Sequence, residues 1–155
     1  MPSKNVRIRS ASIKDLNALV ELEQIAFQKD AFNPRRIKYL LTSARSTVFV
    51  LEKNKEIIGA AYLLWHKNRS NGRIYNIVIT PKLQGRGYGE KLLRECERAC
   101  KRRHCRLISL EVRIDNKPAI AFYKKHGFEI TGKLTGYYDD GAAGWKLRKE
   151  FRKCV

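Results

Sequence analysis

A strand, a glycine-rich turn and the start of a helix follow one another within residues 73–93. The first part, RIYNIVIT, is rich in β-branched residues, and the turn places glycine at positions 85, 87 and 89. Glycine lets the backbone turn tightly, so that the N–H groups of the helix's first turn can point at one anion, helped by the helix dipole. The stretch therefore predicts a phosphate-binding turn at a helix N-terminus.

Two common phosphate-binding motifs do not fit this turn. A dinucleotide fingerprint needs G-x-G-x-x-G and a P-loop needs Gly-Lys followed by Ser or Thr, whereas residues 85–92 read GRGYGEKL. Residues 84–89, QGRGYG, instead resemble the Q/R-x-x-G-x-G/A pyrophosphate loop of the GCN5-related N-acetyltransferase (GNAT) superfamily. Alone, this pattern is also compatible with a glycine-rich turn that binds nothing.

A second stretch, residues 109–128, resembles another signature of the same superfamily. Its sequence SLEVRIDNKPAIAFYKKHGF is similar to L-E-V-R-x-x-N-x-x-A-I-x-x-Y-x-x-x-G-F, in the form seen in bacterial enzymes that acetylate the N-terminal alanine of a ribosomal protein. The element order agrees from Arg7 to about Leu147. The resemblance implies an α/β (α+β) GNAT fold, with a mixed central sheet of about seven strands and about four flanking helices, as one domain over residues 1–155.

Hydrophobic periodicity and capping residues predict the individual elements. Strands are expected at residues 7–11, 47–52, 56–65, 73–80, 106–112, 128–134 and 144–148, and helices at residues 12–27, 33–41, 87–103 and 118–126. The first helix begins at Ser12, with Asp15 at its third position, and continues with a mostly apolar stripe of Leu16, Leu19, Val20, Glu23 and Phe27. In the resembled family the first two helices shape the acceptor side.

The composition predicts one cytoplasmic domain without disulfide bonds. A chain of 155 residues can bury a sizeable core without covalent staples. No apolar stretch is long enough to cross a bilayer, and the N-terminus MPSKN lacks the apolar core of a signal peptide. The four cysteines fit this compartment as reduced thiols.

The chain is strongly basic, with 33 Lys and Arg against 15 Asp and Glu, a formal net charge of +18 and a pI near 10.1. The basic residues form several clusters, among them residues 35–38 and 101–106. Such a field attracts polyanions, and the candidates are the phosphates of coenzyme A, ribosomal RNA, tRNA or an acidic protein. The same charge is also compatible with a solvated basic surface that binds no partner.

Three cysteines and a histidine lie close together in sequence, at Cys96, Cys100, His104 and Cys105. Helical spacing puts Cys96 and Cys100 on one face, which would suit a metal ion. No C-x-x-C knuckle is present, however, and free cysteine is a common core residue. The sequence therefore predicts buried thiols and no metal.

The resemblance implies a site for acetyl-CoA. The pyrophosphate loop supplies Gln84, Gly85, Arg86, Gly87, Tyr88, Gly89 and Glu90. The thioester and pantetheine are expected beside the main chain of Ile77, Val78 and Ile79, where a bulge frees an N–H for the carbonyl. Asn116 falls where the family's asparagine contacts the cofactor, although it is equally suited to cap the following helix.

Glu111 and Tyr123 are the candidate catalytic residues. Glu111 lies in the otherwise apolar run LISLEV and matches the glutamate that serves as base in the resembled enzymes, acting directly or through water. It could instead form an ion pair with Arg113 or another cation on the solvent face of a strand. Tyr123 matches the acid that protonates or hydrogen-bonds the leaving thiolate, although Phe122 and Tyr123 could both be packing residues.

The acceptor is less well defined by the sequence. Tyr137 and Tyr138 resemble the tyrosine pair over the peptide's N-terminus. The next segment, DGAAGW, departs from the family's D-A-x-x-M pattern, with Trp145 where methionine is common. We expect direct acetyl transfer to a primary amine, most simply a protein N-terminus such as that of a ribosomal protein. The alternatives are an aminoacyl-tRNA, another small amine, or a catalytically silent protein that binds RNA or the ribosome through its basic surface.

Overall fold

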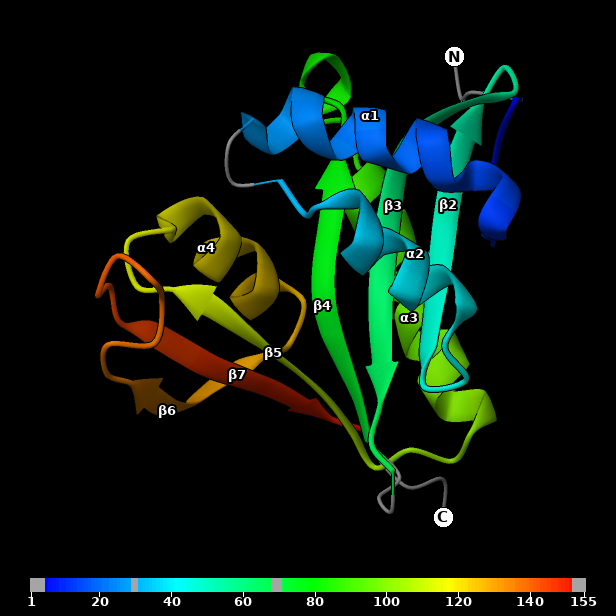
Figure 1. Ribbon diagram of the computed structural model, residues 1–155. Helices are drawn as coiled ribbons and strands as arrows, with labels where there is room; N and C mark the ends of the chain where they lie inside the picture. Colours follow the sequence, from blue (N-terminus) through cyan, green and yellow to red (C-terminus); the bar gives the residue numbers. More distant parts are fainter. Residues whose placement is uncertain (1–4, 29–30, 68–70, 152–155) are drawn as a thin grey trace.

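The computed structural model describes residues 5–28, 31–67 and 71–151 (Figure 1). These residues form a 7-stranded mixed sheet in the order β1-β2-β3-β4-β5-β7-β6. β4 and β5 are parallel neighbours, and the other neighbouring strands are antiparallel. The strands are β1 (Val6–Ser10), β2 (Ser46–Lys53), β3 (Glu56–Trp65), β4 (Asn71–Ile79), β5 (Leu107–Arg113), β6 (Glu129–Leu134) and β7 (Gly144–Glu150).

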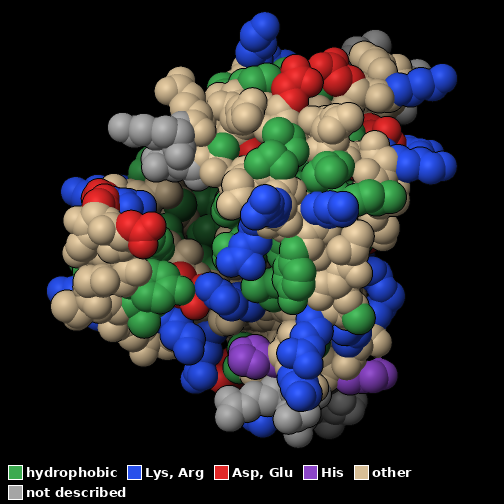
Figure 2. Space-filling model, viewed as in Figure 1, with side chains coloured by type: hydrophobic (Ala, Val, Ile, Leu, Met, Phe, Trp, Pro, Cys, Tyr) green, Lys and Arg blue, Asp and Glu red, His purple; other side chains and the backbone are tan. Residues whose placement is uncertain are grey.

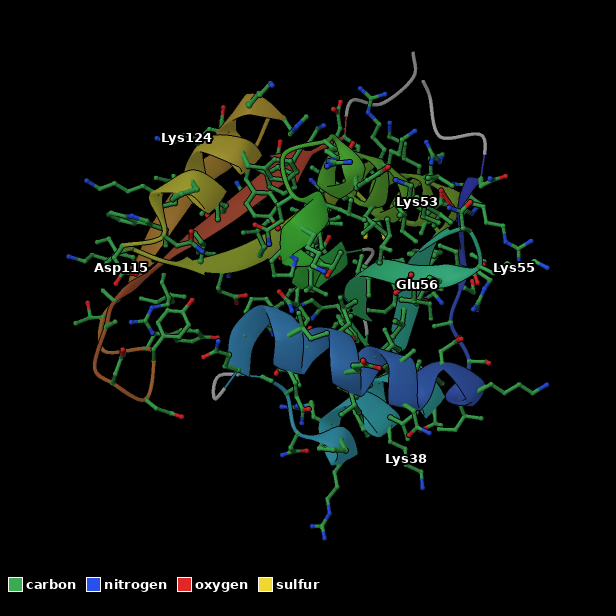
Figure 3. The ribbon with its side chains drawn as sticks, turned by 90° about the horizontal axis from the view of Figure 1, so that it is seen from above. Lys38, Lys53, Lys55, Glu56, Asp115 and Lys124 are labelled. Atoms are coloured by element: carbon green, nitrogen blue, oxygen red, sulfur yellow. The ribbon has the colours of Figure 1, made fainter. Side chains whose placement is uncertain are left out.

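The helices cover the two faces of the sheet in pairs (Figures 1 and 3). They are α1 (Leu16–Phe27), α2 (Pro34–Thr42), α3 (Tyr88–Arg102) and α4 (Lys117–Lys125). α1 and α2 pack on one face of β2, β3 and β4, α3 packs on the other face, and α4 joins the core on the side of α3, beside β5 (Figure 1). We call these the α1–α2 face and the α3–α4 face. No helix in the described residues is long and apolar enough to cross a membrane.

Each face has its own hydrophobic core. On the α1–α2 face, Leu19 and Ile37 are fully buried against alternate residues of the sheet, such as Val50. On the α3–α4 face, Leu92 and Cys96 are fully buried, one helical turn apart, as expected for the amphipathic helix predicted over residues 87–103.

The predicted elements are confirmed, with small shifts at their ends. The hairpin of β2 and β3 and the final pair of β6 and β7 are present. Asn33 caps α2 by accepting the Arg36 N–H at 2.9 Å. The first predicted helix instead opens as a 3-10 turn, Ile13–Asp15, in which Asp15 accepts the Ser12 N–H at 2.8 Å, and α1 follows directly.

β4 and β5 pair over only part of their lengths. Asn71–Ile74 lie opposite Leu107–Leu110. Beyond Ile74, β4 keeps only its pairing with β3, and beyond Leu110, β5 keeps only its pairing with β7. In the described residues the two strands therefore diverge, and Figure 1 shows β5 turning away from β4.

A bulge in β4 marks the point where this divergence starts. Leu63 of β3 lies opposite Ile74, whereas the preceding Tyr62 lies opposite Asn76, so Tyr75 is an extra residue. Tyr75 and Asn76 both contact the α1–α2 face, although neighbours in a regular strand point to opposite faces. The bulge was expected beside residues 77–79; it lies just before them.

Candidate functional site

The glycine turn between β4 and α3 leaves open space around its backbone. Gly85 and Gly87 have φ angles of 79° and 85°, and a Cβ built on either would meet nothing within 4 Å. Gly87 is the N-cap residue of α3, and its carbonyl accepts the Lys91 N–H at 3.2 Å. The N–H groups of Gly89 and Glu90 lie in the first turn, where the helix offers them no acceptor. The turn can therefore bind an anion through its main chain.

Several side chains of this loop have structural roles. The Gln84 amide donates to the Ile79 carbonyl at 3.1 Å and so fixes the loop to the end of β4. The Tyr88 side chain is buried in the core, and Glu90 forms an ion pair with Arg94 at 2.6 Å. Arg86 is exposed. The loop therefore offers an anion its backbone and the Arg86 guanidinium.

Asn116 caps α4, which is one of the two roles expected for it. Its side-chain oxygen accepts the Ala119 N–H at 3.3 Å and caps α4. A hydrogen bond to its own helix fixes the orientation of the amide, whose NH₂ group still has donors for a ligand. A contact with the cofactor stays a prediction.

The two candidate catalytic residues lie on opposite faces of the sheet. Leu110 and Val112 are buried on the α3–α4 face, so Glu111 between them points to the α1–α2 face. Tyr123 of α4 packs into the core of the α3–α4 face. The two side chains can act on one ligand only where β4 and β5 diverge, because the sheet is continuous elsewhere.

Glu111 has a cationic partner, although not the neighbour named from the sequence. Its carboxylate accepts a hydrogen bond from Arg73 Nε of β4 at 2.7 Å, and its side chain is 18% exposed. Arg113 instead pairs with Asp140 at 2.6 Å. Glu111 is thus held by one guanidinium and stays partly accessible.

Tyr123 is enclosed by aromatic rings. Phe122 and Phe128 lie edge-on to it at ring-centroid distances of 5.1 and 5.3 Å. Burial raises the pKa of its phenol well above the usual value of 10.0, and the neighbouring Cys96 adds to the shift. Tyr123 is therefore neutral at physiological pH and can donate a hydrogen bond.

The loop between β6 and β7 brings the tyrosine pair towards Glu111. The rings of Tyr137 and Tyr138 meet edge-to-face at 5.1 Å, and Tyr137 is 47% exposed. Burial raises the pKa of Tyr138, and the nearby charge of Glu111 contributes to the shift. The ion pair of Arg113 with Asp140 fixes this loop to the end of β5, on the side of the candidate base.

Glu23 is a site residue that the sequence did not single out. This carboxylate is fully buried on α1, where it accepts the Asn76 amide at 3.2 Å directly beneath the β4 bulge. Burial raises its pKa to about 7, and the nearby Phe32 backbone and the Asn76 amide partly offset this rise. The sequence signal that could have identified Glu23 is a single carboxylate in the otherwise apolar stripe of α1.

The clustered cysteines belong to the core. Cys96, Cys100 and Cys105 are buried free thiols. Burial raises the pKa of Cys96 to about 12 and also raises that of Cys100 and Cys105. Among the described residues no group of three or more His, Cys, Asp and Glu side chains could hold a metal ion.

A surface cavity of about 810 Å³ lies away from these residues. Its lining comes from β1 and from the turn between β2 and β3, and includes Arg7, Glu52 and Lys55. None of its lining residues belongs to the glycine turn, β5 or the tyrosine loop. Its volume alone does not make it the site, because the polar groups that could perform chemistry converge elsewhere.

Comparisons with known proteins find a matching family model and similar proteins. The model of the acetyltransferase (GNAT) family matches residues 15–128. A putative [ribosomal protein bS18]-alanine N-acetyltransferase from Bacillus subtilis is 31% identical over 133 residues, which cover 86% of this chain and 87% of that protein.

Solved structures confirm the predicted fold. The ribosomal-protein-S18-alanine N-acetyltransferase from Escherichia coli superimposes with a TM-score of 0.87 at 24% identity, covering 97% of this chain and 96% of that one. Arabidopsis thaliana Naa50, in complex with the bisubstrate analogue CoA-Ac-MVNAL, gives a TM-score of 0.81 at 25% identity, covering 95% and 99%. The glycine turn, the diverging strands and the match over residues 15–128 together show that the chain belongs to the acetyltransferase (GNAT) family.

Proposed function

We propose that the protein transfers the acetyl group of acetyl-CoA to the N-terminal α-amine of a protein. The observation that carries this proposal is the placement of the anion-binding turn and Glu111 on opposite faces of the sheet, at the point where β4 and β5 diverge. A donor and an acceptor can thus approach one point from two sides. The names of the Bacillus subtilis relative and of the Escherichia coli structure support an α-amine acceptor.

The donor's phosphates fit the glycine turn. The open space around Gly85 and Gly87 and the exposed Arg86 suit a pyrophosphate. The pantetheine arm has amide groups that can pair with the β4 edge at residues 77–79, which no strand covers on the β5 side among the described residues. In our proposal the turn, Arg86 and this edge hold acetyl-CoA, which supplies an activated thioester, and Asn116 adds a contact.

Glu111 removes the proton that the amine must lose. An α-amine has an unperturbed pKa of about 8, so a carboxylate reached directly or through one water suffices as the base. The amine nitrogen forms a bond to the thioester carbon as the carbon–sulfur bond breaks, and the sulfur leaves as a thiolate. Arg73 keeps the Glu111 carboxylate oriented, and Tyr137 and Tyr138 line the approach of the acceptor.

Tyr123 stabilises the leaving thiolate by a hydrogen bond. The usual pKa of a tyrosine, 10.0, already exceeds the value of about 8.5 typical of a thiol, and burial raises the pKa of Tyr123 further. Full proton transfer from the phenol to sulfur would therefore be uphill. A hydrogen bond from the neutral phenol has no such cost. The buried thiols take no part, and no acyl-cysteine intermediate is needed.

The test is acetylation of peptides that contain one internal lysine, with either a free or a formylated N-terminus. We expect acetyl groups on the free α-amine and none on the formylated peptide, as located by fragment-ion mass spectrometry. Glu111→Gln should lower kcat by about 100-fold. The control Glu56→Gln removes an exposed carboxylate of the β2–β3 hairpin, far from Asp115 at the end of β5 (Figure 3), and should keep full activity.

Two results would contradict the proposal. One is acetylation of lysine, of a polyamine or of aminoacyl-tRNA with no turnover of the free α-amine. The other is equal kcat for the wild type and Glu111→Gln. RNA binding without any acetyl transfer would favour the non-catalytic alternative.

A further inference from the structure

A second cavity, of about 310 Å³, lies beside the candidate base on the α1–α2 face. Its lining combines three arginines with aromatic and leucine side chains from α2, the segment after α2, β3 and β4: Arg36, Tyr39, Leu40, Arg45, Leu64, Trp65, Arg73 and Tyr75. We call it the arginine cavity. Figure 2 shows Lys and Arg side chains gathered across the middle of this face, beside a hollow.

The positive charge of the arginine cavity is largely uncompensated. No carboxylate lines it, and among the described residues Arg36 and Arg45 form no ion pair. Elsewhere in the protein, Arg9, Arg94 and Arg98 each pair with a carboxylate within 3.1 Å. A cluster of guanidinium groups repels itself unless an anion joins it, so this cavity favours an anionic ligand.

Aromatic rings support two of the guanidinium groups. The Arg36 and Arg73 guanidinium carbons lie 5.4 and 5.8 Å from the centroid of the Tyr75 ring. Phe32 stacks on the same ring at 5.0 Å. Cation–π contacts leave the N–H groups at the guanidinium edge available, and these match a carboxylate in bidentate geometry.

Arg73 connects this cavity with the chemistry. It lines the cavity and also donates to Glu111 at 2.7 Å, so the cavity begins one side chain away from the position proposed for the acceptor amine. An extended chain advances about 3.4 Å per residue. Only the first few residues of an acceptor protein can therefore lie over the arginine cavity.

We propose that the arginine cavity recognises acidic side chains within the first few residues of the acceptor, so that the preferred substrates are proteins with acidic N-terminal sequences. The inference rests on the proposed function and names its substrate class. Arg36 and Arg45 bind the carboxylates, and Tyr75 and Tyr39 pack against the acceptor's main chain. The formal net charge of +18 assists the approach of such an acceptor.

Peptides that differ only in charge provide the test. The panel is Ala-Asp-Glu, its near-isosteric neutral form Ala-Asn-Gln, and Ala-Lys-Lys, each followed by the same tail. The wild type should prefer the acidic peptide over the neutral one by at least about tenfold in kcat/KM, mainly through KM. This preference should weaken as salt increases.

Matched variants separate the cavity from the general surface charge. Arg36→Gln/Arg45→Gln should reduce the preference to about twofold or less, because kcat/KM should fall by a larger factor for the acidic peptide than for the neutral one. Lys38→Gln is the control, because Lys38 lies on the same helix and points away from the sheet (Figure 3). It removes one positive charge and should keep the preference.

The outcomes distinguish the two proposals. Equal turnover of all three peptides, or equal loss of preference in Lys38→Gln, would overturn the arginine cavity as an acidic-acceptor site and leave the proposed function standing. No turnover of any peptide would refute both. Competitive inhibition by a single-stranded oligonucleotide, lost in Arg36→Gln/Arg45→Gln and without any acidic preference, would assign the cavity to nucleic acid instead.

Discussion

Glu23 of α1 accepts a hydrogen bond from Asn76 of β4 at 3.2 Å and thereby joins a helix to the bulge that opens the sheet. The carboxylate is fully buried, and its second oxygen has no hydrogen-bond partner among the described residues. A buried carboxylate is costly when it is ionised. The support of the bulge by Glu23 should therefore depend on pH.

The first prediction concerns the pH dependence of stability. Burial raises the pKa of Glu23 from 4.5 to about 7 in the folded protein. The protonated form is thus favoured in the native state, so the associated stability is fully present below pH 4.5 and is lost as the pH rises through about 7. The melting temperature should fall between pH 5 and 8, with a contribution from this group of about 3 kcal/mol.

Glu23→Gln should remove this dependence. Glutamine keeps an oxygen for Asn76 and carries no charge, so the variant should be more stable than the wild type above pH 7. Melting curves at pH 5, 6, 7 and 8 measure the effect. A Glu23→Gln protein whose melting temperature falls with pH as steeply as that of the wild type would exclude Glu23 as the titrating group.

The second prediction concerns the glycine turn. Gly87→Ala places a side chain at a φ of 85° and adds a Cβ to the open space at the start of α3. The backbone strain should destabilise the fold by about 1 kcal/mol. The added methyl group should also weaken coenzyme A binding by about tenfold, because it occupies the space in which the phosphates are proposed to bind.

Gly141→Ala is the matched control for this variant. Gly141 has a φ of 84°, and a Cβ built on it would likewise meet nothing within 4 Å, but it lies in the loop between β6 and β7. It should show a similar loss of stability with unchanged coenzyme A binding, as measured by titration calorimetry. Equal effects of both variants on coenzyme A binding would show that the glycine turn has no special role.

The third prediction concerns Tyr123. Tyr123→Phe removes the hydroxyl and keeps the ring contacts with Phe122 and Phe128. It should therefore fold normally and lower kcat by about tenfold to 100-fold, with little change in KM. A thiol of lower pKa leaves more easily and needs less stabilisation. The loss of kcat in Tyr123→Phe should therefore be smaller with an activated acetyl thioester than with acetyl-CoA. The same deficit with both donors would indicate a packing role alone.

The fourth prediction concerns the buried thiols. With the pKa of Cys96 raised to about 12, on the order of one thiol in 10⁴ is ionised at pH 8. Iodoacetamide should leave Cys96 and Cys100 unlabelled in the native protein and label them in guanidinium chloride, as shown by peptide mapping. Rapid labelling of either residue in the native protein would contradict the packing described for α3.

The local features of this protein could be predicted from its sequence. Asn33 precedes a proline, and Asn116 stands two residues before one, so both helix starts could be located by their caps. The glycine turn could be predicted because its residues are adjacent in the chain. Such signals depend on a few neighbouring residues and need no knowledge of the tertiary structure.

The pairings that form the site could not be predicted in this way. Arg73 and Glu111 are 38 positions apart, and Glu23 and Asn76 are 53 apart. The sequence offered Arg113, two residues further along the same face of β5, as a nearer partner for Glu111, but Arg113 pairs with Asp140 instead. The bulge was expected only from the family resemblance, and its position at Tyr75 could not be read from the periodicity of the strand.

The divergence of β4 and β5 also affects how this protein avoids aggregation. Unpaired strand edges normally lie at the margins of a sheet, where they can recruit a strand from another molecule. Here the unpaired edges of residues 75–79 and 111–113 face each other inside the sheet, with strands on both outer sides. A slender ligand with amide groups can reach them, whereas a strand of another protein would have to enter the gap between β4 and β5. The protein thus keeps main-chain hydrogen-bonding groups available for a ligand without exposing them to its neighbours.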